Sequence, residues 1–375
     1  MRPGMSEHKK DGGLLDVVIG CDCDPDRPQY GGTRYDTRAP LRWRGVREGI
    51  RRAREIADGV RDDFGNPARI TWCVRSDLQM QEIYGDCAWA YSEFSDLWEH
   101  LARCGDEIAW HPHLWRWHEQ EACWYQEIED EDWIRRCLRE GHRALSDRMG
   151  HAPTTSRMGW EFHNNVTMQQ LNDLGIRVDF SAIPGRYTAG RPDKWGSMFN
   201  CHVDWRGTPE YPYHPSVLDF RTRADGHGTA LDVLELPMSV FRSPLLAAGA
   251  FARRLANASG FKGLTQVLRS AKSVQDPVKA YVTTRPAIFA RLVMAKIGEA
   301  KRLGHATLVT AFHADDMCIE RDRFGLIYDA LHLGTNLEGM RTRTKQAGVA
   351  LSFTTASVAS HLPASWTQRV ETPVS

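Results

Sequence analysis

The stretch Leu14–Gly20 reads LLDVVIG, and CDCDPD follows it at positions 21–26. A short apolar run of this kind is typical of a strand that is buried on both faces within a parallel sheet. Arg42–Val60 comes next with apolar side chains at helical spacing, and Ile70–Val74 (ITWCV) is strand-like again. These elements predict a β-α-β unit, in which the first two strands lie parallel in one sheet.

The same alternation of strands and helices continues along the chain. Further strands are predicted at Glu107–Trp110, Thr154–Met158, Ile176–Phe180, Leu231–Leu236, Ala306–Phe312 and Val349–Phe353, and further helices around 94–101, 324–347, Trp133–Met149 and Val166–Leu174. About seven or eight strands separated by helices predict an α/β fold with a parallel sheet, and this number closes naturally into a barrel. A doubly wound open sheet is the alternative.

The composition is that of a globular chain, with 375 residues of which 42% are hydrophobic. Its 48 Lys and Arg residues balance its 48 Asp and Glu residues, which excludes an electrostatic case for general nucleic-acid binding. No window approaches the ~20 consecutive apolar residues that a membrane-spanning helix needs. Since no repeat or clean boundary divides the chain, we expect a single catalytic domain over 1–375, with the barrel at about 14–360.

The nine cysteines are scattered and form no CxxC pair. In a chain of this length they are typical of reduced thiols rather than of a disulfide framework. The start of the sequence, MRPGMSEHKKDGG, has no apolar run that would make it a secretory signal. We therefore expect a cytoplasmic protein.

Two segments interrupt the alternation. Residues 183–229 form a long loop rich in Pro, Gly, Tyr and Trp, and residues 244–303 contain helices that we interpret as an insertion between two strands. Loops of such length are usually functional, and loops after parallel strands open onto the end of the sheet where chemistry takes place. We expect one or both segments to form a wall of the active site.

Polar side chains follow four of the predicted strands. They are Asp22, Asp24 and Asp26; His111 and His113; Arg157; and His313, Asp315 and Asp316. Because the carboxyl ends of parallel strands converge, we expect these groups to meet. Neighbouring carboxylates and two imidazoles on one side of an extended segment suit a bound cation. The alternatives are a solvated acidic turn and packed core histidines.

The order of these motifs resembles the polysaccharide deacetylase family, also called the NodB-homology domain or carbohydrate esterase family 4, of which this chain resembles a divergent member. The motifs that carry the resemblance are CDCDPD, GDEIAWHPHLW at 105–115, SRMGW at 156–160, Asp204-Trp205, and LVTAFHADD at 308–316. The resemblance spans about Val17 to Phe353. It implies a distorted parallel (β/α)7-type barrel.

The resemblance also implies roles for individual residues. Asp22 is the catalytic base, Arg157 keeps it ionised, and His313 is the catalytic acid; Asp24, His111 and His113 hold a divalent metal, for which Zn²⁺ suits the ligands; Asp179 or Asp204 orients one of these groups. The Asp-x-Asp spacing leaves open which of Asp22 and Asp24 is the base. The second histidine of the family corresponds in position to Trp115, so His118 stays an alternative to His113.

The resemblance therefore implies a metal-dependent amidohydrolase that removes an acetyl group from an N-acetylated amino sugar or a related glycan precursor. Trp115 and Trp160 adjoin the motifs and are expected to bind the substrate, together with Asp204, since sugars stack on aromatic rings. The expected partner is a small-molecule or glycan substrate, with no nucleic acid and no membrane span. The alternatives are hydrolysis of another C–N bond and a sugar-binding pseudoenzyme.

Overall fold

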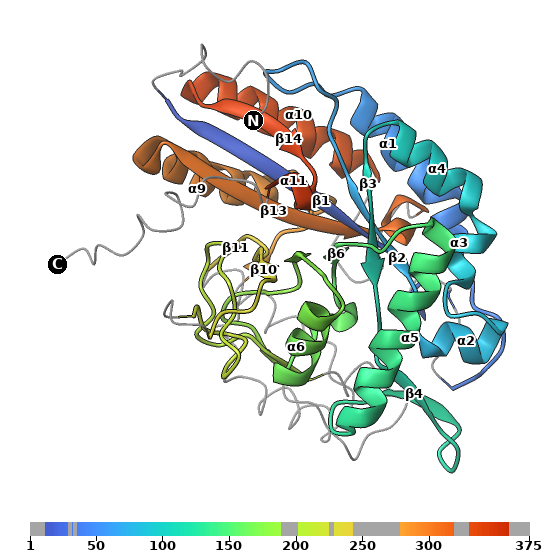
Figure 1. Cartoon of the computed structure of the whole chain (residues 1–375). Helices are drawn as coiled ribbons and strands as arrows, with labels where there is room; N and C mark the ends of the chain where they lie inside the picture. Colours follow the sequence, from blue (N-terminus) through green and yellow to red (C-terminus); the bar gives the residue numbers. More distant parts are fainter. Residues whose placement is uncertain are drawn as a thin grey trace, which may run out of the picture.

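A curved sheet of eight strands forms the centre of the computed structural model (Figure 1). The structure describes residues 12–28, 32, 36–188, 202–224, 229–242, 278–318 and 330–359. The strands of the sheet are β1 (Leu14–Cys23), β2 (Thr71–Arg75), β3 (Glu107–His111), β6 (Thr155–Ser156), β7 (Val178–Asp179), β10 (Leu234–Glu235), β13 (His305–His313) and β14 (Ala350–Thr354). Seven of them follow the order β10-β7-β6-β3-β2-β1-β13, and β14 pairs with β1. All of these pairings are parallel.

Strand β1 lies at the middle of this arrangement. It pairs with β13 from Leu14 to Asp22 on one side. On its other side its first half pairs with β14 and its last residues pair with β2. Leu15 and Val17 pack in one apolar layer and Val18 packs in the other, so the strand is buried on both faces, as its sequence predicts.

The sheet curls toward closure between its two ends. After β10, the Ser239 N–H donates to the Val309 carbonyl oxygen of β13 at 2.9 Å, and the Ser239 hydroxyl accepts from the Val309 N–H at 3.0 Å. Strands β6, β7 and β10 have only two residues each, whereas β1 and β13 have ten and nine. This inequality distorts the barrel. The prediction of a distorted parallel barrel is confirmed, and the open doubly wound sheet is not formed.

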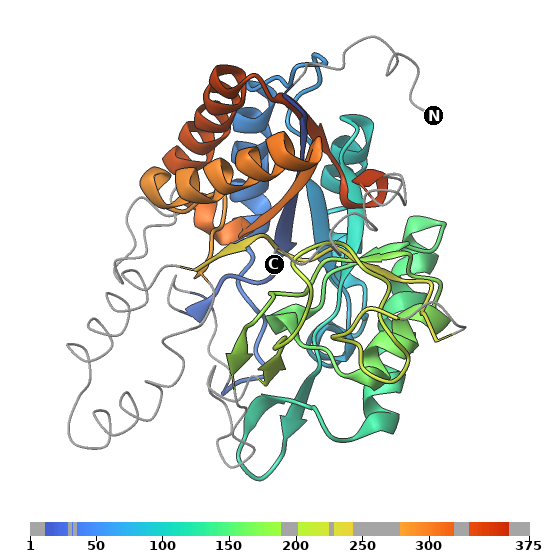
Figure 2. The same cartoon turned by 90° about the vertical axis from the view of Figure 1, so that its left-hand side faces the viewer.

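Helices cover the outside of the sheet. They are α1 (Ile50–Asp58), α2 (Leu78–Tyr84), α3 (Trp89–Glu93), α4 (Ser95–Arg103), α5 (Glu131–Met149), α6 (Asn165–Asp173), α9 (Pro286–Leu303), α10 (Ala330–Ala347) and α11 (Ala356–Ala359). Helices α9, α10 and α1 lie side by side along β1, β13 and β14 (Figure 2). A π-helical turn, Gly45–Gly49, leads into α1, where the sequence predicts one helix from Arg42 to Val60.

Three short antiparallel pairs stand outside the central sheet in the described part of the chain: β4 (Trp115–His118) with β5 (Cys123–Gln126), β8 (Tyr187–Thr188) with β9 (Val203–Asp204), and β11 (Val240–Phe241) with β12 (Val278–Lys279). The hairpin β4–β5 follows β3 directly and projects from the body of the molecule (Figure 1).

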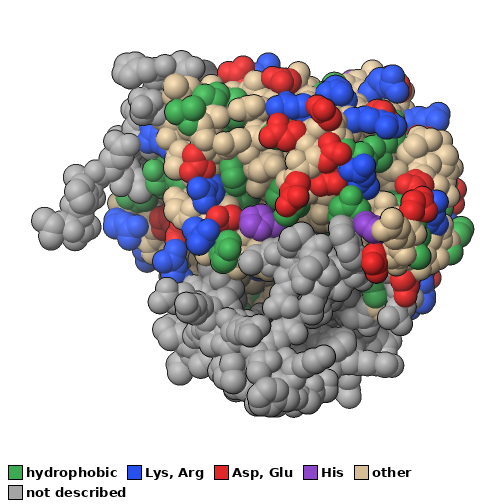
Figure 3. Space-filling view, turned by 90° about the horizontal axis from the view of Figure 1, so that it is seen from below, with side chains coloured by type: hydrophobic (Ala, Val, Ile, Leu, Met, Phe, Trp, Pro, Cys, Tyr) green, Lys and Arg blue, Asp and Glu red, His purple; other side chains and the backbone are tan. Residues whose placement is uncertain are grey.

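The two long segments singled out in the sequence are described in part. Within 183–229, Trp205 and Phe220 are buried, with ring centroids 5.0 Å apart. Within 244–303, residues 244–277 lie outside the described residues, and α9 packs against β13 as a helix of the barrel wall. No helix in the described part of the chain is long and apolar enough to cross a membrane. Acidic and basic side chains are interspersed over the described part of one face (Figure 3).

Candidate metal centre and active site

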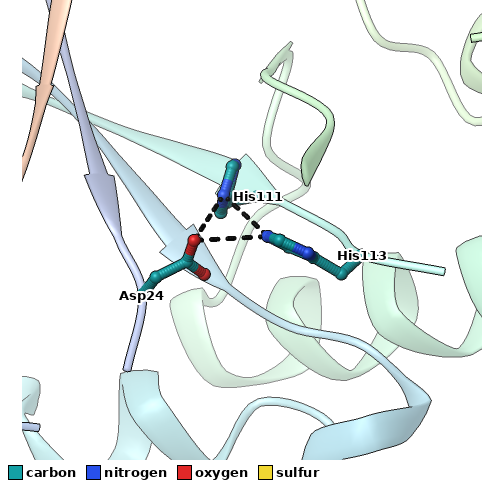
Figure 4. Close-up of side chains that lie close together, drawn as sticks. All are labelled: Asp24, His111 and His113. Carbon is teal, nitrogen blue, oxygen red and sulfur yellow. Dashed lines mark hydrogen bonds and ion pairs between the residues drawn. The ribbon is translucent and has the colours of Figure 1, made fainter. Parts of the chain in front are cut away.

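Asp24, His111 and His113 meet at the carboxyl ends of β1 and β3 (Figure 4). Oδ2 of Asp24 lies 3.2 Å from Nε2 of His111 and 3.3 Å from Nε2 of His113. The two Nε2 atoms lie 3.1 Å apart. Both histidines are buried. We call these three residues the ligand triangle.

The ligand triangle has the dimensions of a metal site. A tetrahedral cation with metal–ligand bonds of ~2.0 Å separates its ligand atoms by about 3.3 Å, close to the spacings found here. One carboxylate and two imidazoles are a ligand set that Zn²⁺ accepts. Three protein ligands also leave a tetrahedral position for substrate or water, which a catalytic site requires. The residues therefore fit a divalent cation.

His111 directs its Nε2 atom at this site. Its Nδ1 lies 2.5 Å from the carbonyl oxygen of Arg157, an acceptor, so Nδ1 carries a ring proton and Nε2 is the nitrogen turned toward Asp24. Burial by itself lowers the pKa of His111, but the carboxylates of Asp24 and Asp22 outweigh it and the pKa is raised.

His113 is held in the other tautomer. The indole N–H of Trp115 donates to Nδ1 of His113 at 2.8 Å. Burial, and then the charge of Arg75, lower the pKa of His113 to about 4, so its ring is neutral at pH 7 with its single proton on Nε2. A cation needs the lone pair of Nε2. His113 therefore becomes a ligand only when its proton moves to Nδ1 and the Trp115 N–H moves away.

Arg75 holds the second oxygen of Asp24. Its Nη1 donates to Oδ1 of Asp24 at 2.9 Å from the last position of β2. Arg75 is not among the site residues expected from the sequence. Its signal is positional, because it pairs in register with His111 of the neighbouring strand and so faces the same side of the sheet.

Asp22, Arg157 and His313 form a second group beside the ligand triangle. Nε of Arg157 donates to Oδ1 of Asp22 at 2.7 Å, and Nε2 of His313 lies 3.8 Å from Oδ2 of Asp22. The register of β1 and β13 explains this contact, since Asp22 pairs with His313. Burial raises the pKa of Asp22, but the charge of Arg157, together with His111 and His313, outweighs burial and the pKa is lowered.

His313 has a lowered pKa, caused by burial and then by the charge of Arg27. Its backbone N–H donates to Oδ2 of Asp316 at 3.1 Å, and Arg27 forms ion pairs with Asp315 and Asp316. Nδ1 of His313 is buried and has no hydrogen-bond partner among the described residues. The loop after β1 and the turn after β13 thus fix His313 from two sides.

Alternation along β1 separates the two kinds of side chain in CDCDPD. Asp22 and Asp24 are two residues apart and face the site, whereas Cys21 and Cys23 face the opposite apolar layer. Both cysteines are free and buried. Both cysteines therefore face away from the ligand triangle.

Other predicted residues lie away from these groups. His118 belongs to the hairpin β4–β5, where its Nδ1 accepts from the Glu121 N–H at 3.2 Å, and it is not part of the ligand triangle. The carboxylate of Asp204 is paired with Arg206 and Arg221 at 2.7 Å and 2.9 Å, and the structure does not bring it to Asp22 or His313.

Asp179 supports the segment that carries Arg157 without reaching the reacting groups. It accepts from the Ser156 hydroxyl at 2.6 Å and from the Ser181 N–H at 3.0 Å, and Nε2 of His163 lies 3.3 Å away. Asp179 thus ties β6 to the chain after β7.

A strained turn follows Arg157. Trp160 and Glu161 have φ values of 57° and 58°, which residues other than glycine rarely adopt. Ion pairs from Glu161 to Lys279 and Arg186 hold the turn. Burial raises the pKa of Glu161, but these cations, Lys279 first, lower it to about 2.

The turn also completes the surroundings of His113. A Cβ atom at Gly159 would lie 2.1 Å from the His113 ring, so only glycine fits there. The rings of Trp160 and Trp115 meet edge to face at 5.9 Å between centroids. Trp115 is itself buried, which leaves Trp160 as the more accessible of the two tryptophans expected to bind substrate.

Comparison with known proteins adds three partial likenesses in structure. A protein provisionally assigned as a polysaccharide deacetylase from Mycobacterium smegmatis is 16% identical, with a TM-score of 0.48 over 93% of this chain and 90% of its own. One provisionally assigned as a glycoside hydrolase/deacetylase from Parabacteroides distasonis is 18% identical, with a TM-score of 0.48 over 91% and 70%. The PuuE allantoinase is 13% identical, with a TM-score of 0.45 over 96% and 91%. No known family model and no curated protein matches the sequence.

Proposed function

We propose that this chain is a metal-dependent amide hydrolase that removes an acetyl group from an N-acetylated amino sugar or a related glycan precursor. The observation that carries the proposal is the adjacency of two groups: the ligand triangle, and the Asp22 carboxylate flanked by Arg157 and His313. Hydrolysis of an amide needs activated water, stabilisation of the developing oxyanion and a proton for the departing amine.

The ligand triangle would hold the cation. When bound there, a divalent ion such as Zn²⁺ supplies a Lewis acid that polarises the amide carbonyl and lowers the pKa of water. Asp24 would supply Oδ2 and His111 its Nε2, and His113 would add the third ligand atom once Trp115 has moved.

Asp22 is placed to act as the base. Arg157 occupies Oδ1 and lowers the pKa of the carboxyl group, which keeps Asp22 ionised. Oδ2 is directed toward His313 and is left to accept the proton of the attacking water. Arg157 is itself fixed by a hydrogen bond of 2.6 Å to the Phe180 carbonyl oxygen.

His313 is placed to act as the acid. When protonated, it would donate its Nε2 proton to the amine nitrogen as the C–N bond breaks, and acetate and the free amine are released. The water proton goes to Asp22, and return of that proton to His313 over the 3.8 Å between them restores both groups.

The experiment combines elemental analysis of the purified chain with an assay of acetate release from N-acetylglucosamine and its oligomers. We expect about one divalent cation per chain and metal-dependent acetate release. His111→Ala should lose both, whereas His118→Ala, a histidine outside the triangle, should keep both. If the chain binds metal but releases an acyl group other than acetate, it is a metal-dependent hydrolase of another C–N bond. Absence of both metal and turnover would leave a sugar-binding pseudoenzyme.

We also propose a cytoplasmic location. The eight cysteines in the described part of the chain are all free thiols, as expected for a reducing compartment. Fractionation of cells that produce the full chain tests this proposal, and recovery outside the cytoplasm would overturn it.

A further inference from the structure

The two carboxylate oxygens of Asp24 face different partners. Oδ2 faces Nε2 of His111 and of His113 at 3.2 Å and 3.3 Å. Oδ1 accepts from Nη1 of Arg75 at 2.9 Å. Since Arg75 is 3% exposed, water cannot readily replace it at Oδ1. Only one oxygen of Asp24 is therefore directed at the ligand triangle.

Arg75 is itself held by every nitrogen of its guanidinium group. Nε donates to the Asp77 carboxylate, and Nη2 donates to Oε1 of Gln79 at 2.6 Å. Asp77 is the N-cap of α2, accepting from the Gln79 N–H at 2.9 Å. A guanidinium fixed at three points cannot follow a carboxylate that rotates.

The same turn supports a second corner of the triangle. Oδ2 of Asp77 accepts from the backbone N–H of His113 at 3.0 Å. The residues 75–77, directly after β2, therefore hold the Asp24 side chain and the His113 backbone in one rigid unit. Partners of this kind around metal ligands typically change metal affinity by about 10–100-fold when they are removed.

We infer that Arg75 is a positioning residue that restricts Asp24 to one oxygen and thereby makes the site prefer Zn²⁺ over oxygen-seeking cations such as Mn²⁺. The inference rests on the proposed function, since it requires a cation at the ligand triangle. Manganese and calcium favour carboxylate oxygens and larger coordination numbers, whereas Zn²⁺ accepts two imidazoles and one carboxylate oxygen. The positive charge of Arg75 also offsets the negative charge of the Asp24 carboxylate, and hard cations depend most on that negative charge.

The test compares the dissociation constants of Zn²⁺ and Mn²⁺ by chelator competition, without an activity assay. In Arg75→Met both Asp24 oxygens are available, and the preference for Zn²⁺ over Mn²⁺ should fall by about tenfold or more. Arg75→Lys keeps the positive charge on a single flexible donor, so its preference for Zn²⁺ should lie between those of the wild-type chain and Arg75→Met. If Arg75→Met does not fold, Arg75→Lys provides the test.

Arg54→Met is the matched control. Arg54 is an equally buried arginine whose Nη1 donates to Asp106 at 2.8 Å, at the amino end of β3, and its loss should leave the preference unchanged.

Equal weakening of both ions in Arg75→Met would overturn the inference, because a merely structural arginine changes both affinities alike. The proposed function fails in a different way. If the wild-type chain binds neither ion, the ligand triangle is not a metal site, and both the proposed function and this inference are wrong.

Discussion

The indole N–H of Trp115 donates to Nδ1 of His113 over 2.8 Å, and this contact determines which nitrogen of His113 carries the proton. The proton of His113 is then on Nε2, inside the ligand triangle. Nε2–H of His113 lies 3.3 Å from Oδ2 of Asp24 and 3.1 Å from Nε2 of His111, and Nδ1–H of His111 donates to the Arg157 carbonyl oxygen at 2.5 Å. A cation at the ligand triangle displaces the proton from Nε2 of His113, and Trp115 must then give up its hydrogen bond to Nδ1.

Replacing Trp115 by Phe should therefore strengthen Zn²⁺ binding. Breaking one buried hydrogen bond costs about 1 kcal/mol, so Trp115→Phe should bind Zn²⁺ roughly fivefold more tightly, as measured by chelator competition. Trp117→Phe is the control, since the Trp117 N–H donates to Glu119 at 3.2 Å instead. Weaker binding in Trp115→Phe would show that the indole supports the metal-bound state.

In the wild-type chain, the same event should be visible by NMR. With ¹⁵N-labelled tryptophan, addition of Zn²⁺ should shift one indole N–H signal that is absent from Trp115→Phe. An unperturbed Trp115 signal in a protein saturated with Zn²⁺ would contradict the tautomer argument.

Asp22 and Asp24 are predicted to respond differently to the same substitution. Asp22→Asn should keep the metal and reduce turnover by about 10²–10⁴-fold, because a base is removed and no ligand is lost. Asp24→Asn should lose the metal, because Asp24 supplies the oxygen that faces both histidines. Elemental analysis with an acetate assay checks both variants. The opposite pattern would exchange the two roles.

Much of the fold could be predicted from local sequence. LLDVVIG is apolar except for Asp16 and forms a strand buried on both faces. Strands β6, β7 and β10 have two residues each, so their predicted ranges of five or six residues were too long. Their pairing depends on neighbouring strands and on the segment that follows β10, which local pattern does not reveal.

The sequence indicated the site less completely than the fold. It placed Asp24, His111 and His113 at strand ends, and it left His118 open because the hairpin β4–β5 was not foreseen. Arg75 after ITWCV is indistinguishable in sequence from a surface cation. Its role depends on the register between β2 and β3.

The pKa of His313 should determine the alkaline side of the activity profile. Burial and Arg27 lower this pKa below its usual value near 6.5. A general acid must be protonated, so kcat/KM should fall as the pH rises through this lowered pKa, below pH 6.5. Arg27→Met removes a nearby cation and leaves the carboxylates of Asp315 and Asp316 near His313, so the pKa and the alkaline limb should both move upward.

Titration of the His313 ring by NMR in the metal-free protein measures this pKa directly. Arg44→Met, which removes an arginine paired with Glu48, should leave it unchanged. An alkaline limb that does not move in Arg27→Met would assign the limb to a group other than His313.

Glu235 provides a prediction about stability rather than activity. It is 0% exposed, pairs in register with Asp179, and accepts from the Ala182 N–H at 2.9 Å. Burial, and then the Asp179 carboxylate, raise the pKa of Glu235 well above its usual value. The folded chain therefore keeps this carboxyl group protonated at a pH where the unfolded chain has lost the proton.

Glu235→Gln should stabilise the fold at neutral pH and not at pH 4. Above an unfolded pKa of about 4.3, each pH unit costs the wild-type chain roughly 1.4 kcal/mol through this group, until the raised folded pKa is reached. Glutamine keeps the acceptor for the Ala182 N–H and does not titrate. The free energy of unfolding of Glu235→Gln, measured with denaturant, should therefore exceed that of the wild-type chain by an amount that grows with pH.

Glu127→Gln is the control of opposite sign. Burial raises the pKa of Glu127, but the backbone N–H groups of Glu129 and Asp130 outweigh it and lower the pKa, so that substitution should destabilise the fold above pH 5. A Glu235→Gln variant less stable than wild type at pH 7 would mean that Glu235 is ionised in the folded chain.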